Sequence, residues 1–267
     1  MYTLDSKKLD ILADTVRSLG FLAKSKQAHV HRNFKADGSV LTEMDLEIST
    51  LIQDKVNQLF PECTFISEEF PSVVKPGSPY TFILDPIDGT DVFSQGLPAF
   101  AVALGILDDK RRPVGAYISA PRFGKAKDEL FIRLDPGKEL FIDDEKYMPG
   151  TAKDEIKQVT MGSNGQLQLD FSTFKGKVRT FGSSIIHLVA PVVFDNIDGC
   201  VNQPCFVWDV AAAHAVLLYA GMDIEYADGK PFIYSDEFLY EKKMFRTQIY
   251  AGTKEGIKDL RKNLPLK

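Results

Sequence analysis

The chain contains few cysteines, and they do not form the pattern of a disulfide framework. There are three in 267 residues, Cys63, Cys200 and Cys205. An odd number of unpaired cysteines argues against a disulfide-rich secreted protein and favours a reducing compartment. No matching pair of cysteines or histidines accompanies Cys200 and Cys205, which argues against a zinc site. We therefore expect a cytoplasmic protein.

The chain also lacks a long apolar run and a basic stretch. Its longest apolar run near the middle, residues 99–107, is far shorter than the ~20 residues that cross a bilayer. Residues 1–5 do not resemble a targeting signal, because no basic region precedes an apolar core. The formal net charge is -5, and lysine and arginine form no stripe. We expect neither a membrane nor a nucleic acid as partner.

The composition is that of a globular protein. With 44% apolar and 26% charged residues, the chain can fill a core and solvate its surface. Its length allows one large domain or two coupled ones. A polar stretch with turn residues, residues 138–150, predicts a connection between two halves, residues 1–150 and residues 151–267. We expect an α+β first half and an α/β second half.

Hydrophobic periodicity predicts the individual elements. Residues 6–28 and 42–59 are predicted to be helices, the second capped by Thr42 with Asp45 three positions later, and a loop is expected at residues 33–38. Strands are predicted over residues 64–67, 81–84, 100–107, 114–119 and 129–134. The second half is predicted to alternate strand and helix over residues 158–161, 183–195, 199–202, 210–220 and 247–251, before a closing helix over residues 256–264.

Acidic residues stand at the ends of predicted strands or helices at three places. The central run, after the apolar residues 82–84, is Asp85-Pro86-Ile87-Asp88-Gly89-Thr90. A Glu68-Glu69 pair lies upstream, and Trp208-Asp209 precedes the apolar run of residues 210–220. Hard oxygen ligands from separate elements are what magnesium takes, and a glycine-threonine turn at a helix start can present N–H groups to phosphate. The pattern indicates metal-assisted removal of phosphate from a small molecule.

Simpler interpretations exist for each residue taken alone. Asp85 could end a strand, Asp88-Gly89 could form an ordinary turn, and Asp209 could cap the following helix. Asp209 can cap and bind metal together, because a carboxylate accepts at several lone-pair positions. The four histidines lack ligand or triad spacing, and we assign them no chemistry.

These blocks, in this order, resemble the inositol monophosphatase superfamily of Mg²⁺-dependent, Li⁺-sensitive phosphatases. The resemblance extends from Lys35 to the C-terminal helix. Its relatives include fructose-1,6-bisphosphatases and phosphatases of adenosine bisphosphates. It implies a layered αβαβα sandwich and a homodimer. It also rests on the following blocks: Lys35-Ala36-Asp37-Gly38, Leu41-Thr42-Glu43-Met44-Asp45, Ile66-Ser67-Glu68-Glu69, Gly182-Ser183-Ser184 and Trp208-Asp209-Val210-Ala211-Ala212.

The resemblance implies two to three Mg²⁺ ions per site, with Mn²⁺ as a possible substitute. One ion would be bound by Glu68, Asp85 and the Ile87 carbonyl, a second by Asp85, Asp88 and Asp209, and a weaker third near Glu68. Phosphate would be released by in-line attack of a metal-activated water.

Further roles follow from the same resemblance. Thr90, with Asp45 or Glu68 as proton acceptor, would orient the attacking water. The amides of Gly89 and Thr90 would hold the phosphate. Lys35 would balance the acidic cluster, and Glu69 would support Glu68 from outside the metal site.

The substrate side departs from the family pattern. Gly182, Ser183 and Asn202, with Asp88 and Asp209, are expected to contact the substrate, but Asn202 stands where the inositol enzymes carry a glutamate. Asp91 adds charge beside the phosphate position, and Val92 and Met222 also depart from the pattern.

Three functions therefore stay open. The first is a phosphatase of a polyol or sugar phosphate, such as inositol monophosphate or fructose 1,6-bisphosphate. The second is a phosphatase of 3′-phosphoadenosine 5′-phosphate or histidinol phosphate. The third is a regulatory binding protein that keeps the fold.

Overall fold

Two amphipathic helices form the first layer of the molecule. α1 (Ser6–Lys26) and α2 (Glu43–Leu59) turn apolar faces inward, as their periodicity predicts. The Thr42 hydroxyl donates to Asp45 Oδ2 at 2.6 Å and the Thr42 amide donates to the same oxygen at 2.8 Å, which closes the start of α2. This confirms the predicted cap and places Asp45 on the buried side of the helix.

A seven-stranded sheet lies against these helices. Its strands are antiparallel except for the first pair, β3 and β4. In spatial order the strands are β3 (Thr64–Ser67), β4 (Tyr80–Asp88), β5 (Ala101–Asp108), β6 (Pro113–Ala120), β7 (Leu130–Leu134), β8 (Leu140–Ile142) and β9 (Glu145–Lys146).

A smaller five-stranded sheet follows in the second half of the chain. It is mixed, with parallel pairing around β10 and antiparallel pairing around β14. In spatial order its strands are β11 (Lys177–Arg179), β10 (Gln158–Met161), β12 (Gly199–Asn202), β14 (Ile249–Gly252) and β13 (Asp223–Tyr226).

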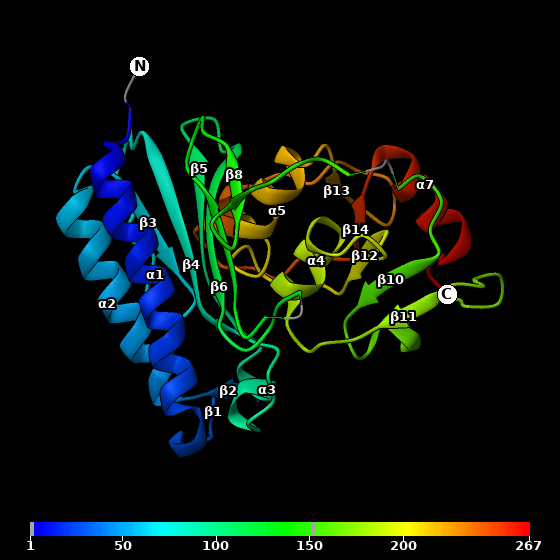
Figure 1. Cartoon of the computed structure of the whole chain (residues 1–267), viewed down its shortest axis with the longest axis horizontal. Helices are drawn as coiled ribbons and strands as arrows, with labels where there is room; N and C mark the ends of the chain where they lie inside the picture. Colours follow the sequence, from blue (N-terminus) through cyan, green and yellow to red (C-terminus); the bar gives the residue numbers. More distant parts are fainter. Residues whose placement is uncertain (1–2, 126, 151–152) are drawn as a thin grey trace.

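Helices occupy the space between the two sheets and the outer face of the second (Figure 1). α4 (Ser184–Val193) and α5 (Ala211–Tyr219) form the middle layer, where α5 packs on β5 and β6 and α4 packs on β12. α7 (Lys254–Asn263) packs against β14 on the far side. The order of layers is helix, sheet, helix, sheet, helix, so the predicted αβαβα sandwich is confirmed.

The predicted connection over residues 138–150 is wrong in part. Its first residues form the hairpin β8–β9, and β8 pairs with β7. Leu140 is buried, so this segment extends the sheet despite its charged residues. The loop predicted over residues 33–38 likewise begins in a small hairpin, β1 (Asn33–Phe34) with β2 (Val40–Leu41).

Several short elements were not predicted. Each is too brief to show a hydrophobic period. Besides the hairpins, they are η1 (Gln27–His29), α3 (Thr90–Ser94), η2 (Gly165–Leu167), β11, β13 and α6 (Asp236–Leu239).

The structure is a computed structural model that describes residues 3–125, 127–150 and 153–267. No helix in these ranges combines the length and apolarity needed to cross a membrane. The main hydrophobic core draws on both halves of the chain, from Ile66 of β3 to Ala251 of β14. The division at residue 150 into two domains stays a prediction.

Candidate metal and phosphate site

The end of β4 and the turn after it carry the central acidic run. Pairing of β4 with β5 shifts register between Asp85 and Asp88, so the strand is irregular where the carboxylates lie. Gly89 follows with φ +86°, in the left-handed region that favours glycine. A β-carbon on Gly89 would lie 3.1 Å from the Gly182 carbonyl oxygen and 3.2 Å from that of Ala99. Glycine is therefore required here for both conformation and space.

Two carboxylates of this run meet a third from a distant part of the chain. Asp85, Asp88 and Asp209 each offer an oxygen, and these oxygens all lie within 4.8 Å of one another. They line a cleft of about 590 Å³ together with Glu68 and Ile87. The five metal ligands expected from the sequence thus share one cleft. Gly89, Thr90 and Lys35 line it as well.

Asp85 has an oxygen with no partner. Its Oδ1 is buried and accepts no hydrogen bond from any residue that the structure describes. Buried polar atoms rarely stay unsatisfied, and an unpartnered oxygen on a carboxylate that belongs to an acidic cluster suits a cation. Carboxylate and carbonyl oxygens are the ligands of Mg²⁺ and Mn²⁺. The residues present therefore fit a divalent cation.

Loss of hydration raises the pKa of every carboxyl in the cluster. It raises the pKa of Asp88 to about 6, although hydrogen bonds from the start of α4 oppose the shift. For Glu68, burial outweighs the Lys35 cation and the pKa rises to about 7. Burial and then neighbouring carboxylates hold the pKa of Asp85 and of Asp209 well above the usual range. A bound cation would relieve this repulsion.

The start of α4 orients Asp88. The Ser183 hydroxyl donates to Asp88 Oδ2, the Ile185 amide donates to the same oxygen at 2.7 Å, and the Ser184 amide donates to Oδ1 at 3.2 Å. Ser183 also caps α4 by accepting from the Ile186 amide at 3.1 Å. Ser183 therefore contacts the acidic cluster directly, in addition to its proposed substrate role.

Asp209 is oriented by a loop and does not cap α5. Its Oδ2 accepts from the Phe206 amide at 2.7 Å, whereas the N-cap position of α5 is Val210. The interpretation of Asp209 as a helix cap is wrong, because the helix begins one residue too late for it.

Thr90 and Asp45 meet beside the cleft. Thr90 Oγ1 lies 3.1 Å from Asp45 Oδ1 and 2.9 Å from the Ile87 carbonyl oxygen. Burial raises the pKa of Asp45 to about 6, with hydrogen bonds from Thr42 opposing the shift. The buried Asp45 carboxylate can therefore accept a hydrogen bond from the Thr90 hydroxyl at the start of α3.

Lys35 bridges the two neighbouring glutamates. Its Nζ lies 2.6 Å from an oxygen of Glu68 and 2.6 Å from an oxygen of Glu69. Burial opposes its charge, but the two carboxylates outweigh burial and hold the pKa of Lys35 above its usual value. Glu68 lines the cleft and Glu69 does not, as the family resemblance implied.

Asp91 lies outside the cleft lining and is partly neutralised. Its carboxylate forms an ion pair with Arg32 from the β1–β2 region and accepts from Gln95 Nε2 at 3.0 Å. The extra negative charge expected beside the phosphate position is therefore balanced by a cation that sequence reasoning did not identify.

Asn202 lies in a second hollow that adjoins the main cleft. The hollow has a volume of about 140 Å³, and Pro204 and Cys205 line both spaces. Asn202 is buried, and its Nδ2 donates to Cys205 Sγ at 3.4 Å. The other residues of the hollow are Gly162, Ser163, Gly182, Ser184, His187 and Gln203. None of its lining residues is a lysine or an arginine.

The histidines that lie in the core have structural partners. His187 Nε2 accepts from the Phe181 amide at 2.7 Å, and burial lowers the pKa of His187 to about 4. His214 lies between Tyr234 and Asp223, with ring nitrogens 3.1 Å and 2.9 Å from their oxygens. His187 also lines the adjoining hollow, and its Nδ1 has no hydrogen-bond partner among the described residues. That the histidines carry no chemistry stays a prediction.

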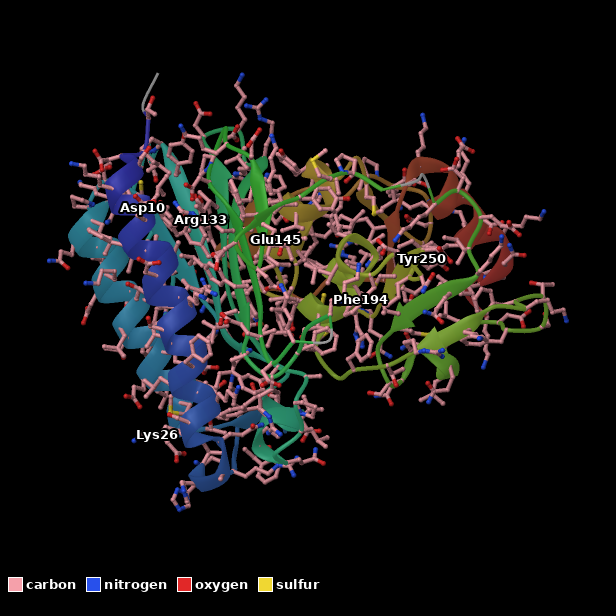
Figure 2. All side chains as sticks on the ribbon, in the orientation of Figure 1. Asp10, Lys26, Arg133, Glu145, Phe194 and Tyr250 are labelled. Carbon is pink, nitrogen blue, oxygen red and sulfur yellow. The ribbon has the colours of Figure 1, made fainter. Side chains whose placement is uncertain are left out.

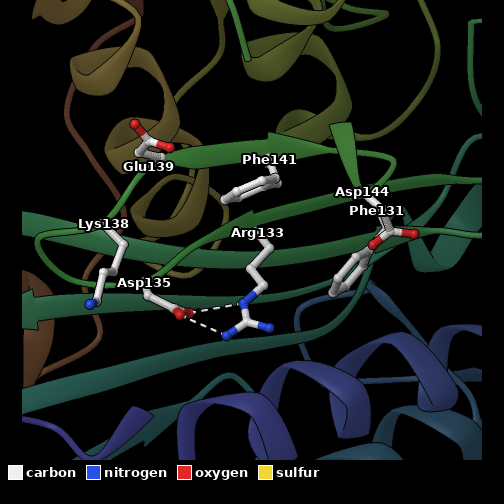
Figure 3. Close-up of a pocket in the computed structure, with 7 residues that line it drawn as sticks. All are labelled: Phe131, Arg133, Asp135, Lys138, Glu139, Phe141 and Asp144. Carbon is white, nitrogen blue, oxygen red and sulfur yellow. Dashed lines mark hydrogen bonds and ion pairs between the residues drawn. The ribbon is translucent and has the colours of Figure 1, made fainter. Parts of the chain in front are cut away.

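A hollow elsewhere on the molecule is a weaker candidate (Figure 3). It measures about 290 Å³ and lies over β7 and β8. Arg133 in this hollow already forms two ion pairs (Figure 2). Its Nη2 lies 2.6 Å from Asp135 Oδ2 and 2.6 Å from Asp10 Oδ1 of α1. The guanidinium joins α1 to the sheet and is not free for a ligand.

Sequence reasoning missed two side chains near the acidic cluster. Phe206 stacks on Trp208 with ring centroids 4.7 Å apart and planes at 9°, and both line the cleft. Lys242 donates to carbonyl oxygens around Glu68. Neither Phe206 nor Lys242 belongs to a sequence motif, so only the folded chain shows their positions.

Comparison with known proteins shows the family to which the chain belongs. Residues 9–257 match the inositol monophosphatase family. The chain is similar to a fructose-1,6-bisphosphatase/inositol-1-monophosphatase of Thermotoga maritima, with 23% identity over 95% of this chain and 98% of the relative. It is also similar to the 3′(2′),5′-bisphosphate nucleotidase CysQ of Escherichia coli K12, with 27% identity over 81% of this chain and 88% of the relative.

A solved structure shares the fold. An inositol monophosphatase/NADP phosphatase complexed with Mg²⁺ and phosphate superposes with a TM-score of 0.75 at 16% identity, over 95% of this chain and 93% of that one. The fold and the acidic cleft define the class of protein, a layered αβαβα sandwich whose carboxylate cluster fits a divalent cation. The chain belongs to the inositol monophosphatase family.

Proposed function

We propose that the chain is a Mg²⁺-dependent phosphomonoesterase acting on a small phosphate ester. The observation that carries the proposal is the unpartnered, buried Asp85 Oδ1 within a cluster of carboxylates. The relatives named above are phosphatases or nucleotidases of the same family. A homodimer and a cytoplasmic location stay predictions.

The chain's own oxygens would hold two to three ions. Glu68, Asp85 and the Ile87 carbonyl would bind one, and Asp85, Asp88 and Asp209 would bind another, with Asp85 shared. When bound, Mg²⁺ neutralises charge on the phosphate and lowers the pKa of the attacking water. These carboxylates repel one another when ionised, so binding of cations between them would be favourable.

Thr90 and Asp45 would receive the proton of the water. Thr90 has one hydroxyl proton and two acceptors, the Asp45 carboxylate and the Ile87 carbonyl. When Thr90 donates to Asp45, its lone pairs are free to accept from a water in the cleft. Asp45 is mostly ionised near neutral pH, since its pKa is about 6. Glu68 is the alternative acceptor.

The turn after β4 would hold the phosphate itself. The Gly89 and Thr90 amides stand at the start of α3, where backbone N–H groups favour negative charge. Asp88, Asp209, Gly182, Ser183 and Asn202 would face the leaving group.

The adjoining hollow favours a polyol or sugar phosphate. Asn202, Ser184 and Gln203 offer neutral donors and acceptors, which suit hydroxyl groups. Inositol monophosphate and fructose 1,6-bisphosphate are the first substrates to test.

A nucleotide is the second candidate. The stacked pair of Phe206 and Trp208 lines the cleft, and a planar base could pack on such rings. This favours 3′-phosphoadenosine 5′-phosphate over histidinol phosphate. Among the described residues that line the cleft, Lys35 is the one lysine, and Glu68 and Glu69 engage it, which disfavours a second phosphate.

The test is phosphate release from a panel of esters. Inositol 1-phosphate, fructose 1,6-bisphosphate, 3′-phosphoadenosine 5′-phosphate and histidinol phosphate would each be assayed with Mg²⁺, with chelator, and with Mg²⁺ plus Li⁺. We expect release with Mg²⁺, none with chelator, and inhibition by Li⁺. No release from any ester by folded, Mg²⁺-bound protein would favour the regulatory binding role.

A further inference from the structure

Lys242 is a partly buried lysine whose ammonium points at backbone oxygens. It follows α6 and has φ +50°, an uncommon value for a residue with a side chain. Its Nζ donates to the carbonyl oxygens of Ser67 at 2.6 Å, Phe70 at 2.5 Å and Glu68 at 3.2 Å. All three N–H bonds of the ammonium thus have an acceptor within reach.

The segment that Lys242 contacts has little other backbone support. β3 ends at Ser67, so Glu68 lies just beyond the paired strand. The Glu68 amide donates to the Leu84 carbonyl at 3.3 Å, a long hydrogen bond. Lys35 holds the Glu68 side chain, whereas Lys242 holds its main chain.

The same ammonium contacts the other side of the cleft. Lys242 Nζ lies 5.5 Å from the ring centroid of Trp208, a cation–π arrangement. Trp208 immediately precedes Asp209. One side chain therefore joins the segment bearing Glu68, from the large sheet, to the segment bearing Asp209, at the start of the middle layer.

We propose that Lys242 is a positioning residue that sets the distance between Glu68 and Asp209 and so tunes cation affinity. The inference rests on the proposed function, because it assumes that both carboxylates bind the cation. Lys242 does not line the cleft, so it acts through the two segments and not on the substrate.

Three features make a lysine specific here. A compact ammonium can point three donors at three converging carbonyl oxygens, whereas the planar fork of arginine cannot. An apolar side chain of similar length would leave these oxygens without their donor. A glutamine keeps two N–H donors but loses the charge over Trp208.

The test compares Lys242→Met and Lys242→Gln with Lys242→Arg and with the control Lys243→Met. Lys243 is the next residue, is exposed, and pairs only at the surface with Glu237 and Glu241 among the described residues. Mg²⁺ affinity would be measured by calorimetry, and kcat at saturating Mg²⁺ on the best ester of the panel. Emission from Trp208, the only tryptophan of the chain, gives a readout independent of activity.

We expect Lys242→Met and Lys242→Gln to bind Mg²⁺ about tenfold more weakly than Lys243→Met, the range seen when a support of a metal ligand is removed. The value of kcat at saturating Mg²⁺ should change much less. Lys242→Arg should recover part of the affinity. Emission of the metal-free protein should differ between Lys242→Met and Lys243→Met, because the charge near the indole is gone.

Unchanged Mg²⁺ affinity in folded Lys242→Met would overturn the inference, as would a fall in kcat without a fall in affinity. If Lys242→Met does not fold, Lys242→Gln decides by the same criteria. Wild-type protein that binds no Mg²⁺ would overturn the metal site and this inference together. Mg²⁺ binding without phosphate release would overturn the enzymatic function but leave the positioning role intact.

Discussion

Thr90 Oγ1 lies 3.1 Å from Asp45 Oδ1, although the two residues are 45 positions apart in sequence. The second oxygen of Asp45 is occupied by Thr42, so its first oxygen is available to Thr90 alone among the side chains described. This arrangement links the start of α2 to the turn after β4 and gives the cleft a hydroxyl backed by a carboxylate.

Thr90→Val is expected to lower kcat by about 10²- to 10⁴-fold, the usual contribution of a proton-transfer group. Valine keeps the shape of threonine but has no hydroxyl to pass a proton to Asp45. The matched control is Thr90→Ser, which keeps the oxygen and should retain most activity. Steady-state kinetics at saturating Mg²⁺ would measure both, and a Thr90→Val enzyme with near-normal kcat would remove Thr90 from the mechanism.

Asp88→Asn is expected to lose turnover on the order of 10²-fold or more while the fold is kept. It removes one charge from a repulsive cluster, and the asparagine oxygen can still accept from Ser183 and the Ile185 amide. Melting temperature and kcat would be measured together. Asp91→Asn, at the exposed pair with Arg32, is the control.

The same variant separates an enzyme from a binding protein. A cellular role that survives in Asp88→Asn while turnover is lost would favour the regulatory function. A large fall in melting temperature with normal turnover would contradict the assignment of Asp88 to the metal site.

The metal-free protein is expected to lose stability between about pH 4 and pH 7. Folding raises the pKa of Asp45 to about 6, of Glu68 to about 7 and of Asp88 to about 6, above the usual ~4 of an unfolded chain. Through these three groups the folded state binds more protons, and stability present at low pH is lost as pH rises through these values. His187, with a pKa of about 4, acts in the opposite direction but is a single group.

Magnesium should offset that loss. Because the cation binds the ionised carboxylates, the rise in melting temperature on adding Mg²⁺ should be larger at pH 7.5 than at pH 5. Thermal unfolding with chelator or with Mg²⁺ across this range measures both effects. If the melting temperature of the metal-free protein increases from pH 5 to pH 7, the pKa values of the cluster carboxyls are not raised by folding.

Asn202→Leu is expected to reduce kcat/KM by roughly tenfold if Asn202 contacts the substrate, since a leucine of similar shape can neither donate nor accept. Mg²⁺ affinity should not change, because Asn202 lines the adjoining hollow and not the metal cleft. Kinetics on the best ester of the panel would show the effect. Equal kcat/KM in the wild-type protein and in Asn202→Leu would exclude Asn202 from the substrate pocket.

The carboxylates of the acidic cluster could be predicted from the sequence because each lies beside a recognisable local pattern. Asp85, Asp88 and Thr90 stand in one short run at the end of an apolar strand, and Asp209 precedes an apolar helix. The two long helices and most strands also follow from periodicity. The family resemblance supplied the order of layers, which no local pattern contains.

The remaining contacts depend on chain segments that meet only in the folded state. Lys242 reaches Glu68 from 174 positions away, and Arg32 reaches Asp91 from 59. The sequence predicts a connection where the β8–β9 hairpin lies, because the three-residue strand β8 is too short to show alternation. Pairing with β7 gives it order through tertiary contacts that a polar composition does not reveal.

The close approach at Gly89 limits which positions of such a protein can be substituted. The turn after β4 and the loop before α4 approach each other closely, so a β-carbon at Gly89 would crowd the Gly182 carbonyl oxygen. The backbone of this loop also forms part of the adjoining hollow, because Gly182 and Ser184 line it. Redesign of selectivity is best directed at Asn202 or Gln203, which line the hollow and are not among the residues expected to bind the cations.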